Sequence, residues 1–597
     1  MDFHGFYTGQ IFDAYEWMGA HYTEKETTFR TFAPQARSVE LLLAGKTIPM
    51  KKAYNGQFYE AVVEDVPLGT EYEYRIFSGS GAVDHCDPYG FFMQKRPDHK
   101  SIVQSLEDYK FDDSVWMKKR SAMKNKPLNI YELHAGSFRK PGGEPDAWYT
   151  YEQLGDLLIP YMKENGYNYV EFLPLCEHPS DESWGYQTTG YFAPTSRYGT
   201  PRQLKKLIDM LHKNDIGAIL DFVPVHFAMD AYGLSKYDGS ALYEYPNNDV
   251  GMSEWGSCNF MHSRGEVRSF LQSSANYWLR EFHFDGLRMD AISRIIFWQG
   301  DERRGVNGNA LDFVKTMNSR LKELNPGCML IAEDSTSFPN ITHDIKEGGL
   351  GFDYKWDLGW MHDTLELFEL PPEKRSESYH KLTFSMMYFG DENYLLPLSH
   401  DEVVHLKGTI VNKIFGTPEE KLAQAKALYM YMAVHPGKKL SFMGNELGHL
   451  REWSEKRELD FYLLDDPLHR QFNDYMKALN NLYLDSAPLY EQDYEGSGFR
   501  WADCDQQEKM IYAIERISKG KRMLALFNLG SEPQSGYRLE LEGVKSAKLL
   551  LNSNSVCYGG NAQSEDFYSM ENNVFTAELA PYSSVLFELE QQCSGNT

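Results

Sequence analysis

The sequence predicts an α/β protein: a (β/α)8 barrel with a β-sandwich before it and an antiparallel β-sandwich after it. Strand-like runs fill about the first 105 residues, apolar strands alternate with helical segments from about 128 to 446, and strand-like runs return from about 488. A chain of 597 residues is too long for one ordinary core. We therefore expect three domains, at residues 1–110, 111–487 and 488–597.

The two flanking domains show the same pattern of short runs rich in aromatic and β-branched residues, separated by Gly, Pro and Asn turns. In the first domain the expected strands are residues 28–32, 39–43, 58–63 and 72–77. In the last they are residues 510–514, 523–527, 537–541, 548–551 and 585–589. Both domains are predicted to be β-sandwiches.

The middle of the chain contains eight apolar strands with helices between them, which indicates a parallel sheet made of βα units. The strands are expected at residues 129–134, 167–175, 217–225, 284–291, 328–334, 351–357, 395–400 and 439–444. One helix begins at Thr200 and Pro201 and ends before Gly217, and another covers residues 266–282. Eight such units predict a closed TIM barrel, with its active site at the C-terminal ends of the strands.

Composition narrows the range of partners. Acidic residues outnumber basic ones by 86 to 60, giving a formal charge of −26, which opposes binding to nucleic acid and to anionic membranes. No apolar run approaches the ~20 residues that span a bilayer, and the start of the chain lacks the features of a secretion signal. We expect a soluble, cytoplasmic protein that acts as a monomer, for which a neutral polymer is a compatible partner.

The seven cysteines, at positions 86, 176, 258, 328, 504, 557 and 593, are odd in number and dispersed along the sequence. They fit neither a disulfide framework nor a set of zinc ligands. We expect reduced cysteines, and neither a metal nor an organic cofactor.

The most informative stretch is residues 284–291, where Arg288 and Asp290 come at the end of an apolar strand. Side chains two apart on a strand share a face, and a nearby cation favours the ionised carboxylate. An ionised, fixed Asp290 is a candidate nucleophile. The alternative is a buried structural ion pair, which is the more common role of an isolated Arg-x-Asp.

Other predicted strands also end in acids or histidines. Glu333 follows an apolar strand, where burial raises the pKa of a carboxyl, and the remaining strand ends carry His226, His400 and Asp401. Each alone could be a solvated loop residue or a structural histidine. Because Asp221 and His226 are an odd distance apart, the chain must leave its strand near Pro224.

An ionised carboxylate beside a protonated one is the pair that cleaves glycosidic bonds. Asp290 would attack the anomeric carbon, while Glu333 would protonate the leaving oxygen and then deprotonate the acceptor, with retention of configuration. Asp401 would be a third carboxylate beside the sugar, and His226 and His400 would donate hydrogen bonds to its hydroxyls.

These strand ends resemble the signature regions of the α-amylase superfamily, at residues 221–226, 287–292, 333 and 398–401. Further stretches, Ser-Trp-Gly-Tyr-Gln-Thr-Thr-Gly-Tyr from 183, Leu-Pro-Leu-Ser-His-Asp-Glu-Val-Val-His from 396 and Phe-Met-Gly-Asn-Glu from 442, resemble those of glycogen (1,4-alpha-glucan) branching enzymes. The first domain looks like the glucan-binding module that precedes such barrels.

The resemblance implies that Asp290 is the nucleophile, Glu333 the acid and base, and Asp401 the transition-state stabiliser. It further implies that the sugar next to the cleaved bond is lined by Tyr186, Asp221, His226, Arg288 and His400. The implied partners are α-glucan polymers such as glycogen and amylose. Three segments depart from the family pattern and are expected to border the groove: residues 260–264, 297–302 and 447–451.

Two other functions fit parts of the sequence. A hydrolase of the same superfamily, amylase-like or debranching, would use the same carboxyls but pass the intermediate to water. A catalytically silent glucan-binding or scaffold protein would be expected to lack at least one of Asp290, Glu333 and Asp401, and all three are present.

Overall fold

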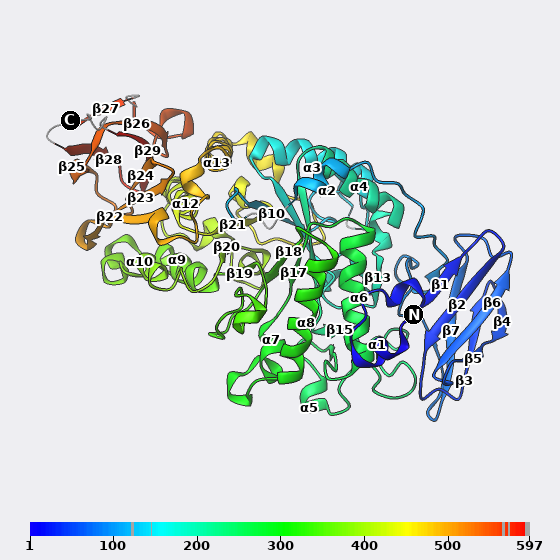
Figure 1. Ribbon diagram of the computed structural model, residues 1–597. Coiled ribbons are helices and arrows are strands. Elements are labelled where there is room, and N and C mark those ends of the chain that lie inside the picture. Colours follow the sequence, from blue (N-terminus) through cyan, green and yellow to red (C-terminus); the bar gives the residue numbers. More distant parts are fainter. Residues whose placement is uncertain (121–123, 145, 564–566, 571–572, 592–597) are drawn as a thin grey trace.

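The computed structural model describes residues 1–120, 124–144, 146–563, 567–570 and 573–591. Figure 1 shows an elongated molecule, with antiparallel sheets at the N-terminal end, a barrel in the middle and a second group of antiparallel sheets at the C-terminal end. Cys593 lies outside the described residues. The six described cysteines are all free, and four of them are buried.

The centre of the molecule is a closed barrel of eight parallel strands, which neighbour one another in chain order. These strands are β10 (Asn129–Leu133), β11 (Tyr169–Phe172), β14 (Gly217–Phe222), β17 (Gly286–Met289), β18 (Met329–Ala332), β19 (Tyr354–Trp356), β20 (Tyr394–Leu398) and β21 (Lys438–Phe442). Each overlaps a strand expected from the sequence, so the predicted fold class is confirmed.

Alternation along the strands divides the inside of the barrel into an apolar floor and a polar upper layer. The floor is a separate cluster of buried residues that includes Ile130, Tyr169, Ile219 and Ile331. Two positions further along the chain from each of these four residues stands an ionisable residue, and these are Glu132, Glu171, Asp221 and Glu333. The C-terminal end of the barrel is therefore the end where ionisable groups gather.

Helices surround the barrel (Figure 1). The main ones are α3 (Tyr151–Asn165), α4 (Pro201–Lys213), α6 (Gly265–Glu281), α8 (Gly308–Leu324), α9 (Leu358–Glu369), α12 (Pro418–Val434) and α13 (Pro467–Asp485). Helix α4 begins as predicted, because Thr200 and Gln203 form a reciprocal capping box and Pro201 is its first residue.

The N-terminal domain is a sandwich of two antiparallel sheets. One contains β1 (Gly19–Tyr22), β2 (Glu26–Phe32), β6 (Phe58–Glu64) and β5 (Lys51–Ala53), and the other β4 (Lys46–Pro49), β3 (Ser38–Leu43), β7 (Glu71–Ser78), β8 (Gly81–His85) and β9 (Ser101–Ile102).

A short helix, α1 (Phe3–Thr8), fixes this sandwich to the barrel. Its Phe6 contacts the rings of Phe32 and Phe58 in the sandwich. On its other side the hydroxyl of Ser269, on α6, donates to the carbonyl of Phe6 at 3.0 Å. The sandwich therefore has a defined position against α6.

The C-terminal domain has a six-stranded and a two-stranded antiparallel sheet with a core of their own. The strands are β22 (Phe499–Gln506), β23 (Ile511–Ser518), β24 (Lys521–Asn528), β29 (Ser583–Gln591), β26 (Val544–Asn552) and β27 (Phe567–Ser569), with β25 (Gln534–Glu540) and β28 (Val574–Leu579) in the smaller sheet. Asp493 links this domain to the barrel: it lies 2.9 Å from Lys438 on β21 and 2.8 Å from Arg516 on β23, and all three are buried.

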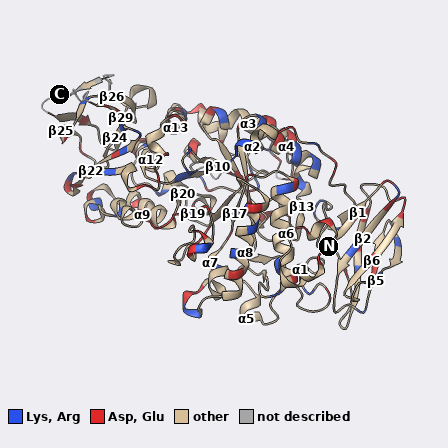
Figure 2. Ribbon diagram, viewed as in Figure 1, with Lys and Arg blue, Asp and Glu red and all other residues tan. Residues whose placement is uncertain are grey.

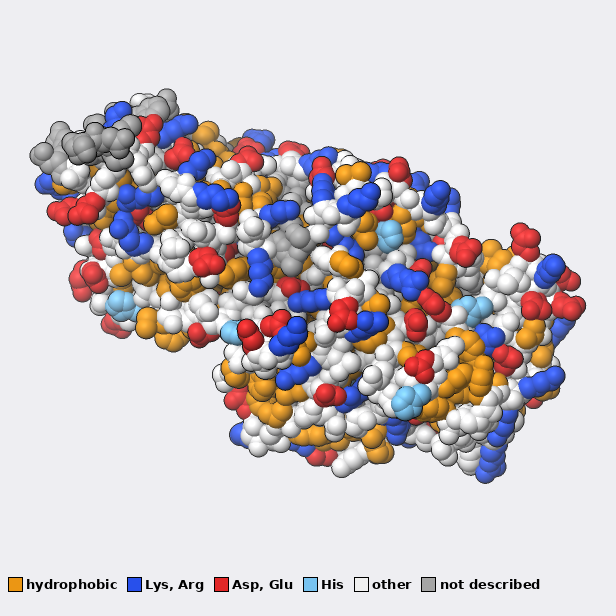
Figure 3. All heavy atoms as spheres, in the orientation of Figure 1, with side chains coloured by type: hydrophobic (Ala, Val, Ile, Leu, Met, Phe, Trp, Pro, Cys, Tyr) orange, Lys and Arg blue, Asp and Glu red, His pale blue; other side chains and the backbone are white. Residues whose placement is uncertain are grey.

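Charged residues of both signs are interspersed along the outer helices and strands (Figure 2). On the face seen in Figure 3, described basic and acidic side chains lie next to one another without a patch of one sign. Within the described part of the chain, no helix has the length and apolarity needed to cross a membrane.

Candidate active site

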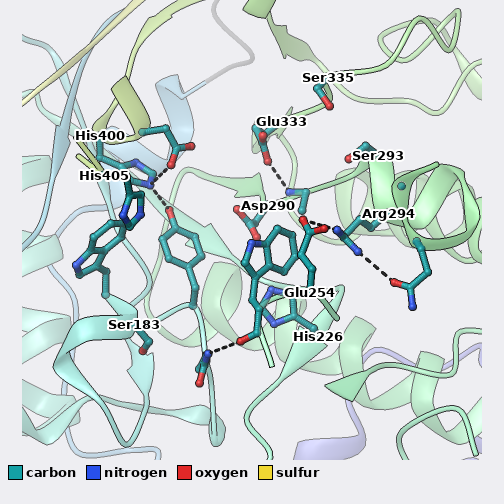
Figure 4. A pocket seen from close by; sticks show the side chains of 18 of the residues that line it. Ser183, His226, Glu254, Asp290, Ser293, Arg294, Glu333, Ser335, His400 and His405 are labelled. Carbon is teal, nitrogen blue, oxygen red and sulfur yellow. Dashed lines mark hydrogen bonds and ion pairs between the residues drawn. The ribbon is translucent and has the colours of Figure 1, made fainter. Parts of the chain in front are cut away.

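A cavity of about 590 Å³ opens at the C-terminal ends of the barrel strands. Figure 4 shows the side chains of Asp290 and Glu333 in it, with His400 on one side and Arg294 on the other. Six of the eight predicted site residues line this cavity: Tyr186, His226, Asp290, Glu333, His400 and Asp401. The remaining two, Asp221 and Arg288, lie buried beside them.

Arg288 organises the base of the cavity. It is buried on β17, and its Nη1 donates to Oδ1 of Asp290 at 2.9 Å and to both carboxylate oxygens of Asp221, at 2.7 and 2.8 Å. Its guanidinium also lies over the ring of Trp356, 4.4 Å from the centroid. The predicted pairing of Arg288 with Asp290 is confirmed, and Asp221 is a second partner of the same cation.

Glu333 comes directly after β18 and contacts the segment that carries Asp290. Its Oε2 accepts a hydrogen bond from the main-chain N–H of Ala291 at 2.6 Å and lies 3.6 Å from Nη2 of Arg288. The adjacent strands β17 and β18 thus bring both carboxyls to one guanidinium.

The pKa of Asp290 differs from the expectation. We expected Arg288 to hold Asp290 ionised, but burial outweighs Arg288 and raises the pKa of Asp290 to about 7. Burial likewise raises the pKa of Glu333 to about 7, as expected. The two carboxyls therefore share protons near neutral pH as a coupled pair. Because Arg288 is hydrogen-bonded to Asp290 but not to Glu333, the geometry favours the singly protonated state with the proton on Glu333.

His400 is held between two carboxylates. Its Nδ1 donates to Oε1 of Glu132 at 2.6 Å, and its Nε2 lies 3.4 Å from Oδ1 of Asp401. Burial opposes the charged imidazole, but Asp401 and Glu132 together raise the pKa of His400 to about 9. Burial also acts to raise the pKa of Asp401, but the charges of His400 and Arg288 bring it below its ordinary value. Asp401 is therefore ionised at neutral pH.

Tyr186 contacts both Asp221, which is a partner of Arg288, and His400. Its hydroxyl donates to Oδ2 of Asp221 at 2.5 Å, and its ring stacks against that of His400, with centroids 5.6 Å apart. One ring face is therefore occupied by protein, so a sugar would stack on the opposite face.

His226 lies past the end of its barrel strand, because β14 ends at Phe222 and His226 belongs to a separate two-residue strand, β15 (His226–Phe227). The predicted departure of the chain near Pro224 is confirmed. Burial lowers the pKa of His226 to about 4, so its ring is neutral, and its Nδ1 has no hydrogen-bond partner among the described residues. This nitrogen is itself buried, so it is not exposed to the cavity.

Several groups at the site were not predicted from the sequence. Trp184, Trp255 and Arg294 line the cavity, but the two tryptophans come from loops and Arg294 from the four-residue helix α7 (Ser293–Ile296), where no periodic pattern marks a residue's direction. Glu132 and Glu171 lie within the apolar runs of their strands. Their position two residues beyond an inward-facing apolar residue is the signal that could have identified them.

Of the three segments that depart from the family pattern, one contributes to the cavity, through Gln299 and Gly300. Residues 260–264 are not among the residues that line the cavity. Nε2 of His262 binds the carbonyl of Pro224, and Arg264 donates to the carbonyl of Ala241 at 2.7 Å. In the third segment, Leu447 and Gly448 are buried. Within the described ranges, no group of three or more His, Cys, Asp or Glu residues is placed to hold a metal ion.

Comparisons with known proteins agree with this architecture. Residues 17–90 match carbohydrate-binding module 48 (isoamylase N-terminal domain), residues 150–245 and 255–519 match the alpha amylase catalytic domain, and residues 501–590 match the alpha amylase C-terminal all-beta domain. Two solved structures share the fold at 19% identity and a TM-score of 0.73. They are a putative alpha amylase from Salmonella typhimurium, matched over 96% of this chain and 100% of that one, and pullulanase type I from Bacillus subtilis, matched over 96% and 85%.

Among curated relatives, the 1,4-alpha-glucan branching enzyme of Geobacillus stearothermophilus is 40% identical over 93% of this chain and 89% of its own length. The enzymes of the same name from Fusobacterium nucleatum and Desulfitobacterium hafniense are 41% and 42% identical. They cover 94% and 93% of this chain and 92% and 91% of their own lengths.

Proposed function

The chain belongs to the α-amylase family and, within it, to the 1,4-alpha-glucan branching enzymes, and from this membership we propose the reaction at its site. It is a glycosyltransferase that cuts an α-1,4-linked glucan chain and transfers the severed part to a 6-hydroxyl, forming an α-1,6 branch. The observation that carries the proposal is the pairing of Asp290 and Glu333 around the single guanidinium of Arg288.

In the first step, the carboxylate of Asp290 attacks the anomeric carbon of the donor sugar while Glu333 gives its proton to the departing oxygen. The singly protonated state of the pair suits these roles. Asp290 accepts the Arg288 hydrogen bond as a carboxylate, and Glu333 carries the proton. The product is a glucosyl ester on Asp290 with inverted configuration.

In the second step, Glu333, now ionised, takes the proton from the acceptor 6-hydroxyl, which displaces Asp290 from the anomeric carbon. Two inversions give net retention. Ionised Asp401 and charged His400 lie beside the reacting sugar, where Asp401 stabilises positive charge and His400 donates to a hydroxyl. Tyr186 offers its free ring face to the sugar, while Asp221 and Arg288 fix the base of the subsite.

We further propose that the enzyme acts as a monomer in the cytoplasm and contributes to glycogen biosynthesis. All eight site residues come from one barrel, so a partner subunit is not needed to complete the site. The three domains are proposed to extend over residues 1–110, 111–487 and 488–597, with the first, which matches a carbohydrate-binding module, holding glucan near the cavity.

The decisive experiment is incubation with amylose, followed by a count of α-1,6 linkages and of new reducing ends. The proposed transfer produces α-1,6 linkages with almost no new reducing ends. Reducing ends without α-1,6 linkages would identify a hydrolase instead.

A further inference from the structure

Glu132 and Glu171 are two buried carboxyls that the proposed reaction does not use. They lie on the adjacent strands β10 and β11, directly opposite each other in the ladder, and neither side chain reaches solvent. Parallel-strand partners face the same side, so both carboxyls lie inside the barrel, next to the layer that carries Asp221 and Arg288. Their environments, however, are different.

Glu132 holds His400 at two points. Its Oε1 accepts from the ring Nδ1 at 2.6 Å and its Oε2 accepts from the main-chain N–H of the same residue at 2.8 Å. This double contact fixes both the backbone and the ring of His400. Because a carboxylate accepts at Nδ1, the ring must carry its proton there, and the charged form carries a second proton on Nε2.

Nε2 of His400 faces the cavity. Its neighbours are the hydroxyl of Tyr186 at 3.3 Å and Oδ1 of Asp401 at 3.4 Å, both longer than a strong charge-assisted hydrogen bond. The Nε2 proton is therefore available to a sugar hydroxyl.

Glu171 has no comparable contact. Neither of its carboxylate oxygens has a hydrogen-bond partner among the described residues, although the side chain is fully buried. A buried, unpaired carboxylate next to a second carboxylate is strongly unfavourable, whereas the protonated acid avoids both the desolvation and the repulsion. Burial and Glu132 accordingly raise the pKa of Glu171 well above its ordinary value.

We propose that Glu132 is a positioning residue that keeps His400 doubly protonated, with Nε2–H directed at the reacting sugar, while Glu171 opposite it stays neutral. This inference rests on the proposed function for the identity of the sugar. The charged and titratable groups around His400 are Glu132, His134, Glu171, Tyr186, Asp221, Arg288, Asp290 and Asp401.

The test compares Glu132→Gln with Glu171→Gln, two identical substitutions at opposing, equally buried positions. Gln at 132 can still accept from the His400 main-chain N–H, and its amide donates to Nδ1 only when the ring is neutral. We expect kcat for amylose cleavage to fall roughly 10- to 100-fold, the effect of losing a charge-assisted hydrogen bond, with KM little changed. The activity of Glu132→Gln relative to wild type should also decline further between pH 6 and pH 8. Glu171→Gln should keep the wild-type pH profile.

A wild-type profile for Glu132→Gln would overturn the proposal, and so would an equal shift in both variants, since that indicates a general response to any change in the buried layer. A second measurement uses the wild-type protein, so it tests the proposal even when Glu132→Gln folds poorly. In wild-type protein with ¹³C-labelled histidine, the His400 resonance, assigned by its loss in His400→Asn, should not titrate between pH 6 and 8. Titration near 6.5 would refute the proposal.

These readouts are independent of the fate of the glucosyl intermediate. Cleavage of the α-1,4 bond precedes both transfer and hydrolysis, so the pH profile tests Glu132 whichever product forms. The linkage count described under Proposed function tests transfer separately.

Discussion

The main-chain N–H of Ala291 donates to Oε2 of Glu333 at 2.6 Å, so the proposed acid and base is fixed to the residue that follows the proposed nucleophile. Ala291 has a φ of 50°, in the left-handed region, which costs a non-glycine residue roughly 1 kcal/mol or more. The next residue, Ile292, donates its N–H to the carbonyl of Glu333 at 2.9 Å. The residue that carries one carboxyl, Asp290, is therefore followed directly by two residues that hydrogen-bond to Glu333. The distance between the two carboxyls is set by this backbone and not by the outer loops.

This arrangement predicts different results for the two carboxyls when the leaving group is changed. Glu333→Gln should reduce amylose cleavage by about 10²- to 10⁴-fold, because the departing oxygen receives no proton. It should recover the first step on an α-maltosyl fluoride donor, since fluoride leaves without a proton. Asp290→Asn should fail on both donors, because the nucleophile is missing.

The matched control is Glu254→Gln, which makes the same chemical change in the same cavity at a residue paired with Arg294 rather than Arg288. It should retain cleavage to within a few-fold. Fluoride release from Asp290→Asn at a rate near wild type would remove Asp290 from its proposed role.

A second prediction concerns stability and pH. The pKa of Glu333 is about 7 in the folded protein, above the value of about 4 for a free Glu, so the folded state binds more protons between these values. Its contribution to the free energy of unfolding is fully present below pH 4 and is lost as the pH rises to 7. Gln at position 333 cannot ionise, so Glu333→Gln does not lose stability in this way as the pH rises. It should be more stable than wild type at pH 7.5 by about 1–3 kcal/mol.

The measurement is thermal or urea unfolding of both proteins from pH 4 to 8. The difference should shrink toward zero at pH 4, where wild-type Glu333 is protonated. A difference that does not depend on pH would mean that Glu333 is not held in its neutral form by burial.

The sequence predicts those contacts of the site that are made by residues close together in the chain, and not those made by distant residues. The pairing of Arg288 with Asp290 is local, because strand geometry puts every second side chain on one face, and the strand alone predicts it. Glu333 is likewise marked by its place after an apolar strand. The raised pKa of Asp290 was not predicted, because it depends on total burial and on Asp221, a residue from another strand.

The contact between Glu132 and His400 shows the other limit. These residues are 268 positions apart, and they meet only because β10 and β20 both flank β21 in the closed barrel. No local pattern specifies that register. The position of Trp255 at the cavity depends in the same way on how its long loop folds back over the barrel.

Arg288 offers a third prediction. Arg288→Leu removes the only ion-pair partner that Asp221 has among the described residues and leaves that carboxylate buried, so we expect a loss of about 3–5 kcal/mol in the free energy of unfolding, together with loss of activity. Arg288→Lys keeps one positive charge but has a single nitrogen, so it cannot contact Asp221 and Asp290 while a second nitrogen lies near Glu333, as Nη1 and Nη2 of Arg288 do. It should be more stable than Arg288→Leu and still largely inactive.

Urea unfolding and amylose cleavage measured on both variants separate these effects. Folding of Arg288→Leu with wild-type stability would show that Asp221 does not depend on the guanidinium. High activity in Arg288→Lys would show that a point charge is sufficient at this position.

The last prediction is that transfer predominates over hydrolysis, and it follows from competition for one intermediate. The glucosyl ester on Asp290 can react with water, which is abundant but unoriented, or with a glucan 6-hydroxyl held in the groove with Glu333 as its base. Well-oriented groups reach effective concentrations of about 10⁵–10⁸ M, far above the ~55 M of water, so a positioned acceptor reacts first. The N-terminal sandwich, fixed against α6, would add to this by keeping glucan near the cavity. On amylose, the iodine complex should fade and α-1,6 linkages should accumulate while total reducing ends barely rise. If reducing ends instead rise in step with the loss of iodine colour, water has access to the intermediate and the acceptor is not held as proposed.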